Sequence, residues 1–258
     1  LHIHSFTLSV KLLSKYMLQI SGFLASRRGW AIIVVIVLHT VGGICMALGD
    51  PIGLVLLTPA HLCITTFILF SIHPPLNREF YKAAFLTFMF GMFIEIVGVR
   101  TGNIFGEYHY TPLLGPRVLG VPIVIGTNWL LLSYCFSALV LWWRPSSRWL
   151  YKVILGGVGM VLLDVIIEPF AVHYGLWIWK GRVLPSMANY LAWFLGGCIV
   201  TSIWLRFWQK PANHQVRFSK STEVDRNIDL IGNNDILLVT ILSLVVFLVL
   251  SSAGIMLN

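Results

Sequence analysis

Charged side chains are scarce in this sequence of 258 residues. Asp, Glu, Lys and Arg together make up 11% of it, hydrophobic residues make up 57%, and the mean hydropathy is +0.84. Soluble domains carry about 25% charged residues, so the composition excludes a water-soluble globular domain. The apolar runs are continuous rather than alternating, which also excludes a transmembrane barrel. The fold class that remains is all-α, a polytopic integral membrane helical bundle, because helices satisfy their own backbone groups in lipid.

Several motifs are missing as well. The sequence has no phosphate-binding loop, no nucleotide-binding fingerprint, no Ser-His-Asp order, no CxxC pair and no internal repeat. The multiple HxxxH and HxxHH boxes of membrane di-iron oxygenases are also missing, so we expect no metal and no cofactor. The formal net charge of +8 arises from basic residues in short loops, where they act as topology signals rather than as a nucleic-acid surface. The four cysteines lie inside apolar runs and are expected to be buried structural thiols.

Seven apolar runs have about the 20 residues needed to cross a bilayer. They cover approximately residues 30–48, 52–72, 81–99, 118–143, 149–172, 189–208 and 236–256. Residues 1–29 mix apolar and basic side chains without a cleavage site, which predicts an amphipathic helix lying on the membrane. We therefore expect a single transmembrane domain over residues 30–258, with residues 209–235 as a cytoplasmic loop.

The basic residues predict the orientation of these spans. With seven spans and a cytoplasmic N-terminus, 14 of the 18 Lys and Arg residues lie inside and 4 lie outside. Positively charged residues favour the cytoplasmic side, so this orientation is preferred. It predicts a multi-pass protein of the cell inner (plasma) membrane with its N-terminus in the cytoplasm.

Three acids stand out inside the predicted spans. Glu95 lies near the end of the third run, and Asp164 and Glu168 lie four residues apart in the fifth, on one helix face. The predicted topology places all three in the outer half of the membrane. An unpaired charge near the bilayer centre costs roughly 3 kcal/mol or more, so these acids are expected to share or retain protons. A neutral carboxylic acid in a dry site is a proton donor.

Other polar groups are predicted at similar depth. Thr58 and His61 fall in the second run, Asn128 reaches middle depth in the fourth, and Asn189 opens the sixth at the outer surface. Polar side chains in membrane helices often serve only helix packing, which is our interpretation of His39 and Thr40. For His61 packing and function are equally favoured.

Two connections, residues 100–116 and 173–188, lie on the same side and are placed to cover the acids. Both are rich in aromatic residues, including Tyr108, Tyr110, Trp177 and Trp179. Such residues also serve as interfacial anchors, and Glu107 and His109 fit a solvated loop. His61, Glu95, Asp164 and Glu168 have the chemistry of metal ligands, but proton transfer is the favoured use of these acids.

Acids in a dry, aromatic-rich pocket suit protonation of an apolar molecule. Protonating a trisubstituted alkene gives a tertiary carbocation, which aromatic faces and carboxylates stabilise. Water positioned by a second polar group then captures the cation. The sequence therefore predicts hydration by general acid and general base catalysis.

Four segments resemble a known family. They are EIVGVRTGNIFGEYHY at 95–110, GVPIVIGTNW at 120–129, DVIIEPFA at 164–171 and PSMANYLAWF at 185–194. Together they are similar to the carotenoid biosynthesis membrane proteins that include carotenoid hydratases, over roughly residues 50–208. The resemblance implies addition of water across the terminal double bond of an acyclic ψ end group, giving a tertiary alcohol without a redox cofactor. The implied partners are an acyclic-ended C40 or C50 carotenoid, the lipid bilayer and other carotenoid enzymes.

The chemistry then suggests a role for each residue. We expect Asp164 or Glu168 to be the general acid and Glu95 to orient water or act as base. The expected substrate-binding residues, which hold water, the product hydroxyl or the end group, are His61, Tyr108, Tyr110, Asn128, Trp129, Trp177 and Asn189.

Two other functions fit the same residues. A lycopene-type cyclase uses the same protonated alkene but lets a neighbouring double bond capture the cation. A proton-coupled transporter or a pigment-binding protein also uses intramembrane acids, although transporters often contain paired repeats.

Overall fold

The computed structural model describes part of the chain at the level of individual residues. The described ranges are residues 21–22, 26–48, 51–72, 77–144, 146–181, 184–208 and 240–248. The predicted amphipathic segment 1–29 lies almost wholly outside them, and the predicted loop 209–235 lies entirely outside. The prediction of one domain over residues 30–258 therefore stays a prediction.

Long apolar helices make up most of the described chain. They are α2 (Arg27–Leu48), α3 (Pro51–Val55), α4 (Thr58–Ser71), α5 (Arg78–Thr101), α6 (Ile123–Trp143), α7 (Trp149–His173) and α8 (Met187–Trp208). Within the described ranges, six helical segments are long and apolar enough to cross a membrane, with α3 and α4 sharing one of them. The fold class predicted from the sequence is confirmed. Of the predicted seventh span only residues 240–248 are described, and they are helical.

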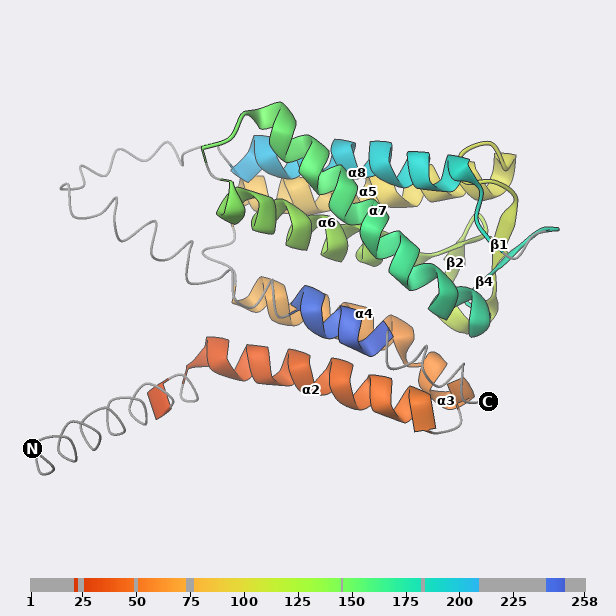
Figure 1. The fold of residues 1–258 in the computed structure, drawn as a ribbon, viewed down its shortest axis with the longest axis horizontal. Coiled ribbons are helices and arrows are strands. Elements are labelled where there is room, and N and C mark those ends of the chain that lie inside the picture. Colours follow the sequence, from red (N-terminus) through yellow and green to blue (C-terminus); the bar gives the residue numbers. More distant parts are fainter. Residues whose placement is uncertain are drawn as a thin grey trace, which may run out of the picture.

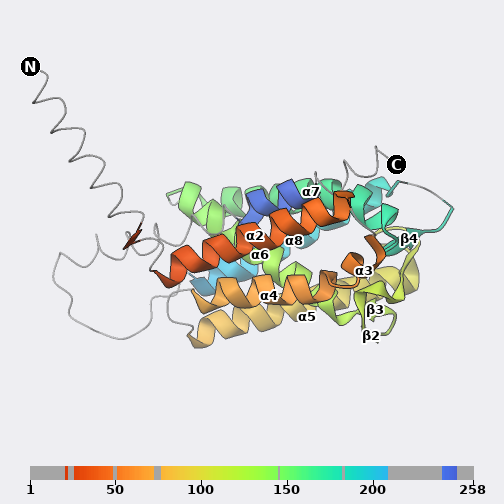
Figure 2. The same ribbon diagram turned by 90° about the horizontal axis from the view of Figure 1, so that it is seen from below.

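Helices α5 to α8 pack together, and α4 joins them by packing against α6. Figure 1 shows α2, α4 and the helical segment 240–248 along one side of this group. From α2 to α8, successive spans run in opposite directions, so the connections between them alternate between the two ends of the bundle (Figure 1). Figures 1 and 2 both show the short strands gathered at one end, which we call the strand end.

Local sequence explains where α5 begins and ends. The side chain of Asn77 caps the first turn by accepting a hydrogen bond from the Phe80 amide at 2.8 Å. The helix ends at Gly102, which adopts a left-handed conformation with φ of 67°. The chain leaves the helix at Gly102 and continues into the connection that carries Tyr108 and Tyr110 at the strand end.

The fourth span begins later than the sequence predicted. Residues 117–122 form a small hairpin in which β2 (Arg117–Val118) pairs with β3 (Val121–Pro122). Its two turn residues, Leu119 and Gly120, both have positive φ, as the tight turns that match strand twist require. Helix α6 therefore starts at Ile123 rather than at Val118, and the predicted start is wrong.

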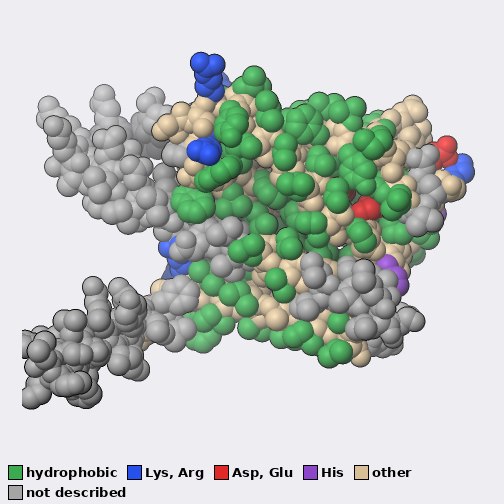
Figure 3. Space-filling view, in the orientation of Figure 1, with side chains coloured by type: hydrophobic (Ala, Val, Ile, Leu, Met, Phe, Trp, Pro, Cys, Tyr) green, Lys and Arg blue, Asp and Glu red, His purple; other side chains and the backbone are tan. Residues whose placement is uncertain are grey.

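Apolar side chains cover the outside of the bundle as well as its interior. Figure 3 shows hydrophobic side chains over most of the visible face between the ends, while Lys and Arg lie toward the ends. One acidic side chain is visible within that face. Exposed Phe67, Phe85 and Phe93 illustrate how apolar the outer surface of α4 and α5 is. A surface of this kind is suited to lipid rather than to water.

Candidate active site

The three predicted acids meet in one cavity at the strand end. Glu95, Asp164 and Glu168 are each at most 4% exposed, although they come from two different helices. Asn128 and Asn189 line the same cavity. The full lining is Glu95, Phe105, Tyr108, Tyr110, Ile125, Asn128, Asp164, Glu168, Trp177, Trp179, Asn189 and Trp193. The site is therefore a small aromatic chamber with three carboxyl groups in its wall.

The carboxyl group of Glu95 receives hydrogen bonds on both of its oxygens. The hydroxyls of Tyr108 and Tyr110 donate to Oε2 at 2.5 and 2.8 Å. The indole Nε1 of Trp129 donates to Oε1 at 3.0 Å, and its ring stacks on Trp193 with centroids 4.6 Å apart. An indole N–H donates only, and three donors around one carboxyl group are the pattern that an ionised carboxylate accepts.

The other two acids are bonded through one oxygen each. Oε1 of Glu168 accepts hydrogen bonds from the indoles of Trp177, at 3.1 Å, and Trp179. Oδ2 of Asp164 accepts one from the Asn189 amide at 2.7 Å. Within the described ranges, no donor contacts Oε2 of Glu168 or Oδ1 of Asp164. Each of these two acids therefore has one carboxyl oxygen that could bond to a molecule in the cavity.

A pair of short strands supplies four of these donors. Strand β1 (Tyr108–Tyr110) pairs antiparallel with β4 (Trp177–Trp179), so that Tyr108 lies opposite Trp179 and Tyr110 opposite Trp177. Successive side chains in a strand point to opposite faces. The four aromatic residues therefore face the acids, and the intervening His109 and Ile178 are exposed.

Further hydrogen bonds hold the two connections together. The Thr111 hydroxyl donates to the Gly175 carbonyl at 2.7 Å, and the Ser186 hydroxyl donates to the Phe105 carbonyl at 2.8 Å. Glu107 forms an exposed ion pair with Lys180, with a separation of 2.6 Å. This contact fits the expectation that Glu107 is a solvated loop residue. The cover over the cavity is thus one structure built from both connections.

Burial affects the two tyrosines of the cover. It raises the pKa of Tyr108 and of Tyr110 well above the ordinary value of 10.0, and the adjacent Glu95 carboxyl raises both further. Both phenols therefore stay protonated near neutral pH and remain available as donors to Glu95.

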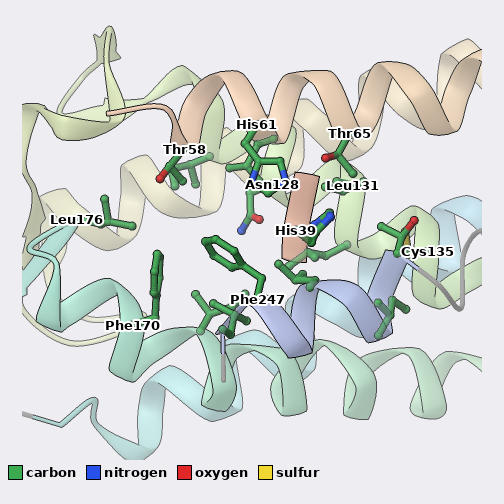
Figure 4. A pocket seen from close by; sticks show the side chains of 18 of the residues that line it. His39, Thr58, His61, Thr65, Asn128, Leu131, Cys135, Phe170, Leu176 and Phe247 are labelled. Carbon is green, nitrogen blue, oxygen red and sulfur yellow. The ribbon is translucent and has the colours of Figure 1, made fainter. Parts of the chain in front are cut away.

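A second, largely apolar cavity adjoins the first. The two share Ile125, Asn128 and Trp177 in their linings. Figure 4 shows Asn128 and His61 directed into this second cavity, with Phe247 on its other side. Thr58 and His61 line this second cavity and not the chamber of the acids. The expected gathering of seven polar positions is thus divided between two adjoining spaces.

Two details differ from the sequence predictions. Asn128 lies in the second turn of α6, close to the strand end, rather than at middle depth, because α6 begins only at Ile123. Asn189 is 3% exposed and bonded to Asp164, so it lies inside the chamber rather than at the outer surface. His39 donates from Nδ1 to the Val35 carbonyl of its own helix at 2.8 Å, which agrees with a packing role.

Sequence reasoning missed Trp179 as a site residue and did not foresee the strands. The signal was present, because YHY at 108–110 and WIW at 177–179 both place aromatic residues two apart, the spacing of a strand face. Among the described residues, no group of three His, Cys, Asp or Glu side chains is arranged to hold a metal ion.

Comparisons with known proteins identify the family of the chain. The family model described as "Carotenoid biosynthesis protein" matches residues 53–257, which extends beyond the region of resemblance found by inspection. The chain is 29% identical over 134 residues to a protein of Haloarcula japonica named bisanhydrobacterioruberin hydratase. That match covers 50% of this chain and 46% of the relative, so the chain spans about half the length of the relative. No solved structure matches the chain. The family match extends over most of the sequence and includes all three acids, and the chain belongs to the carotenoid biosynthesis protein family.

Proposed function

We propose that this protein is a carotenoid hydratase that adds water to the terminal double bond of an acyclic ψ end group. The observation that carries the proposal is the chamber in which three buried acids face aromatic side chains beside an apolar cavity. Membership of a carotenoid biosynthesis family supports a carotenoid as the substrate, and the name of the Haloarcula relative supports hydration. The apolar cavity suits the hydrocarbon chain, and the chamber suits its reacting end.

The reaction begins with proton transfer to the alkene. Asp164 or Glu168 donates the proton, because each has one oxygen without a donor among the described residues. The π electrons of the double bond form the new C–H bond, which leaves a tertiary carbocation. The faces of the surrounding aromatic rings stabilise that cation.

Glu95 takes an electrostatic role in this scheme. Three donors hold its two oxygens, so in this scheme it presents a fixed, electron-rich carboxyl group to the cation and does not exchange protons with water. This refines the expectation that Glu95 orients water or acts as base. A water molecule adds its oxygen to the cation, and the proton it loses returns to the carboxylate that began the cycle. Neither a redox cofactor nor a change in oxidation state is required.

The test is product analysis in a carotenoid-producing bacterial host that expresses the protein. Liquid chromatography with mass detection is expected to show a gain of one water per reacted end on an acyclic-ended carotenoid. A product of unchanged mass with altered absorption would show cyclisation instead. Unaltered pigments, across lycopene, γ-carotene and C50 substrates, would remove the enzyme assignment.

The acids are tested by amide variants that keep their shape. We expect Glu95→Gln, Asp164→Asn and Glu168→Gln each to lower conversion by about 100-fold or more, the contribution typical of a positioned acid or charge. Glu107→Gln is the matched control, because this exposed acid lies outside the chamber. The variants are compared at equal amounts of membrane-extracted protein. Conversion at the wild-type rate in the three variants would contradict the proposed mechanism.

We also propose the membrane and the orientation in it. The protein spans the plasma membrane with its N-terminus in the cytoplasm, so that the strand end faces outward. The distribution of Lys and Arg supports this orientation.

A further inference from the structure

The apolar cavity contains polar atoms that its lining does not satisfy. Nε2 of His61 and Oγ1 of Thr65 are buried, and neither has a hydrogen-bond partner in the part of the chain that the structure describes. Both residues line the cavity and lie four residues apart on α4, so they share one helix face. Leaving a buried polar atom without a partner is unfavourable, so such atoms usually mark the place of a water or a ligand.

The neighbouring threonine shows that an unbonded hydroxyl is not a general feature of this helix. The hydroxyl of Thr66 donates to the Leu62 carbonyl at 2.8 Å, which is the usual way for a helix to satisfy a threonine. Thr66 does not line the cavity, whereas Thr65 does and leaves its hydroxyl unbonded. Of these two adjacent residues, only Thr65 offers the cavity a hydroxyl that can bond a ligand.

The imidazole of His61 is held in place by its surroundings. Its ring packs edge-on against His39, with centroids 4.4 Å apart, and against Phe247 at 5.8 Å. His39 is itself fixed by its bond to Val35. A fixed imidazole nitrogen and a hydroxyl on one face form a small polar site in an apolar wall (Figure 4).

The place of this site relative to the acids indicates its ligand. Asn128 lines both cavities, so the cavity that contains the polar groups of α4 adjoins the chamber in which the carbocation would form. A group that both donates and accepts hydrogen bonds fits an imidazole nitrogen and a hydroxyl. Water and an alcohol share this chemistry, and buried waters typically make about three such bonds to otherwise unsatisfied groups.

We propose that His61 and Thr65 bind the reactant water and hold it next to Asn128, on the apolar side of the acid chamber. This inference rests on the proposed hydratase function. In this proposal the two cavities have different roles: the acids of the chamber supply the proton, and His61 and Thr65 on α4 supply the water. A carbocation formed without that water can lose a proton to regenerate the alkene, lose a neighbouring proton to shift the double bond, or be captured by a neighbouring double bond of the substrate.

The test measures this partition in deuterated water. Membranes containing the protein are supplied with an acyclic-ended carotenoid, and two quantities are followed by mass detection: the hydrated product and the deuterium gained by unhydrated carotenoid. For the wild-type protein we expect mainly hydrated product. For His61→Phe we expect at least tenfold less product while deuterium incorporation continues, because protonation is intact and water capture is lost. His61→Gln replaces the imidazole with an amide that can still bond water, and it is expected to form more hydrated product than His61→Phe.

Two threonine variants provide a matched pair. Thr65→Val removes the unbonded hydroxyl and is expected to lower the ratio of hydration to exchange, whereas Thr66→Val, which removes a hydroxyl bonded within its own helix, is expected to leave the ratio unchanged. Each substitution retains the shape and volume of the side chain, so a general packing defect would affect both.

Three results would overturn the water site. One is normal hydration by His61→Phe, and another is an equal fall of hydration and exchange, which would place His61 in packing or protonation. The third is an unchanged ratio with relief of product inhibition, which would identify the site as one for the product alcohol. If the wild-type protein forms no hydrated product, the proposed function itself fails and the water site fails with it.

Discussion

Tyr108 and Tyr110 connect one carboxyl group to the cover of the cavity. Both hydroxyls donate to the same oxygen of Glu95, and both phenols are buried. Their position has two effects, since the hydroxyls fix the acid and the rings form the wall of the chamber. A residue with both functions is sensitive to its protonation state, because an ionised phenol cannot donate and would repel the carboxylate.

The raised pKa of these two phenols predicts how stability depends on pH. Because the folded-state pKa lies above the ordinary value of 10.0, the protonated phenols contribute stability that is fully present below about pH 10. This contribution declines as the pH rises further and is lost as the phenols ionise. We expect the unfolding temperature of the detergent-solubilised protein to be steady up to about pH 9 and to fall above pH 10.

Phenylalanine variants isolate this effect. The double variant Tyr108→Phe with Tyr110→Phe is expected to lose part of the alkaline fall, because it has no buried phenol beside Glu95. Tyr151→Phe removes an exposed phenol of α7 and serves as the control. An alkaline fall of the same size in all three proteins would show that other groups are responsible.

At the scale of elements, close packing of α7 against α8 positions Asp164 and Asn189. Gly156 and Gly157 on α7 face Thr201, Cys198 and Phe194 on α8, and a Cβ atom at either glycine would collide with these neighbours. Small residues allow membrane helices to approach closely. The same approach brings the Asn189 amide to 2.7 Å from Asp164, about two turns nearer the strand end on α7 and about one to three turns nearer on α8.

Enlarging this contact is expected to destabilise the bundle. Gly156→Ala places a methyl group against the side chain of Thr201, and overpacking of this kind typically costs about 1–3 kcal/mol. The expected result is a lower unfolding temperature in detergent. Gly53→Ala is the matched control, because nothing lies within 4 Å of a Cβ atom there. Equal unfolding temperatures for the two variants would mean that the α7–α8 contact does not limit stability.

At the scale of the whole molecule, the bundle presents chemically different ends to the two sides of a membrane. The connection between α6 and α7 carries Arg144 and Arg148, whereas the strand end carries the cover of the acid chamber. The proposed orientation therefore assigns the cover to the outer side. Product leaving through the cover would be released on that side.

One cysteine introduced at each end of the bundle tests this orientation. In a background without the exposed Cys63, His109→Cys at the strand end is expected to react with a membrane-impermeant maleimide on intact cells. Ser146→Cys, at the opposite end, is expected to react only after the cells are permeabilised. The reverse pattern would invert the orientation and place the cover in the cytoplasm.

Much of this architecture follows from the sequence, and the exceptions have physical causes. Continuous apolar runs predicted five of the six described spans to within a few residues. The predicted depth of Glu95, Asp164 and Glu168 in the membrane was enough to predict that the three acids lie together. The hairpin before α6 was missed because Val118 is apolar, and a hydropathy run does not register a two-residue turn. The pairing of β1 with β4 joins segments more than 60 residues apart, and such pairing is not encoded in local periodicity. Trp179 was missed as a site residue for the same reason.

The order of the partners along the chain has a consequence for biogenesis. Glu95 is bonded by residues 13, 15 and 34 positions later, Glu168 by residues 9 and 11 positions later, and Asp164 by a residue 25 positions later. Every acid is therefore synthesised before its donors. During translation each one is inserted before its donors, and an unpaired charged acid inside the membrane costs up to about 3 kcal/mol at the helix centre. The three acids therefore lack their full set of donors until Asn189, near the start of α8, has been inserted.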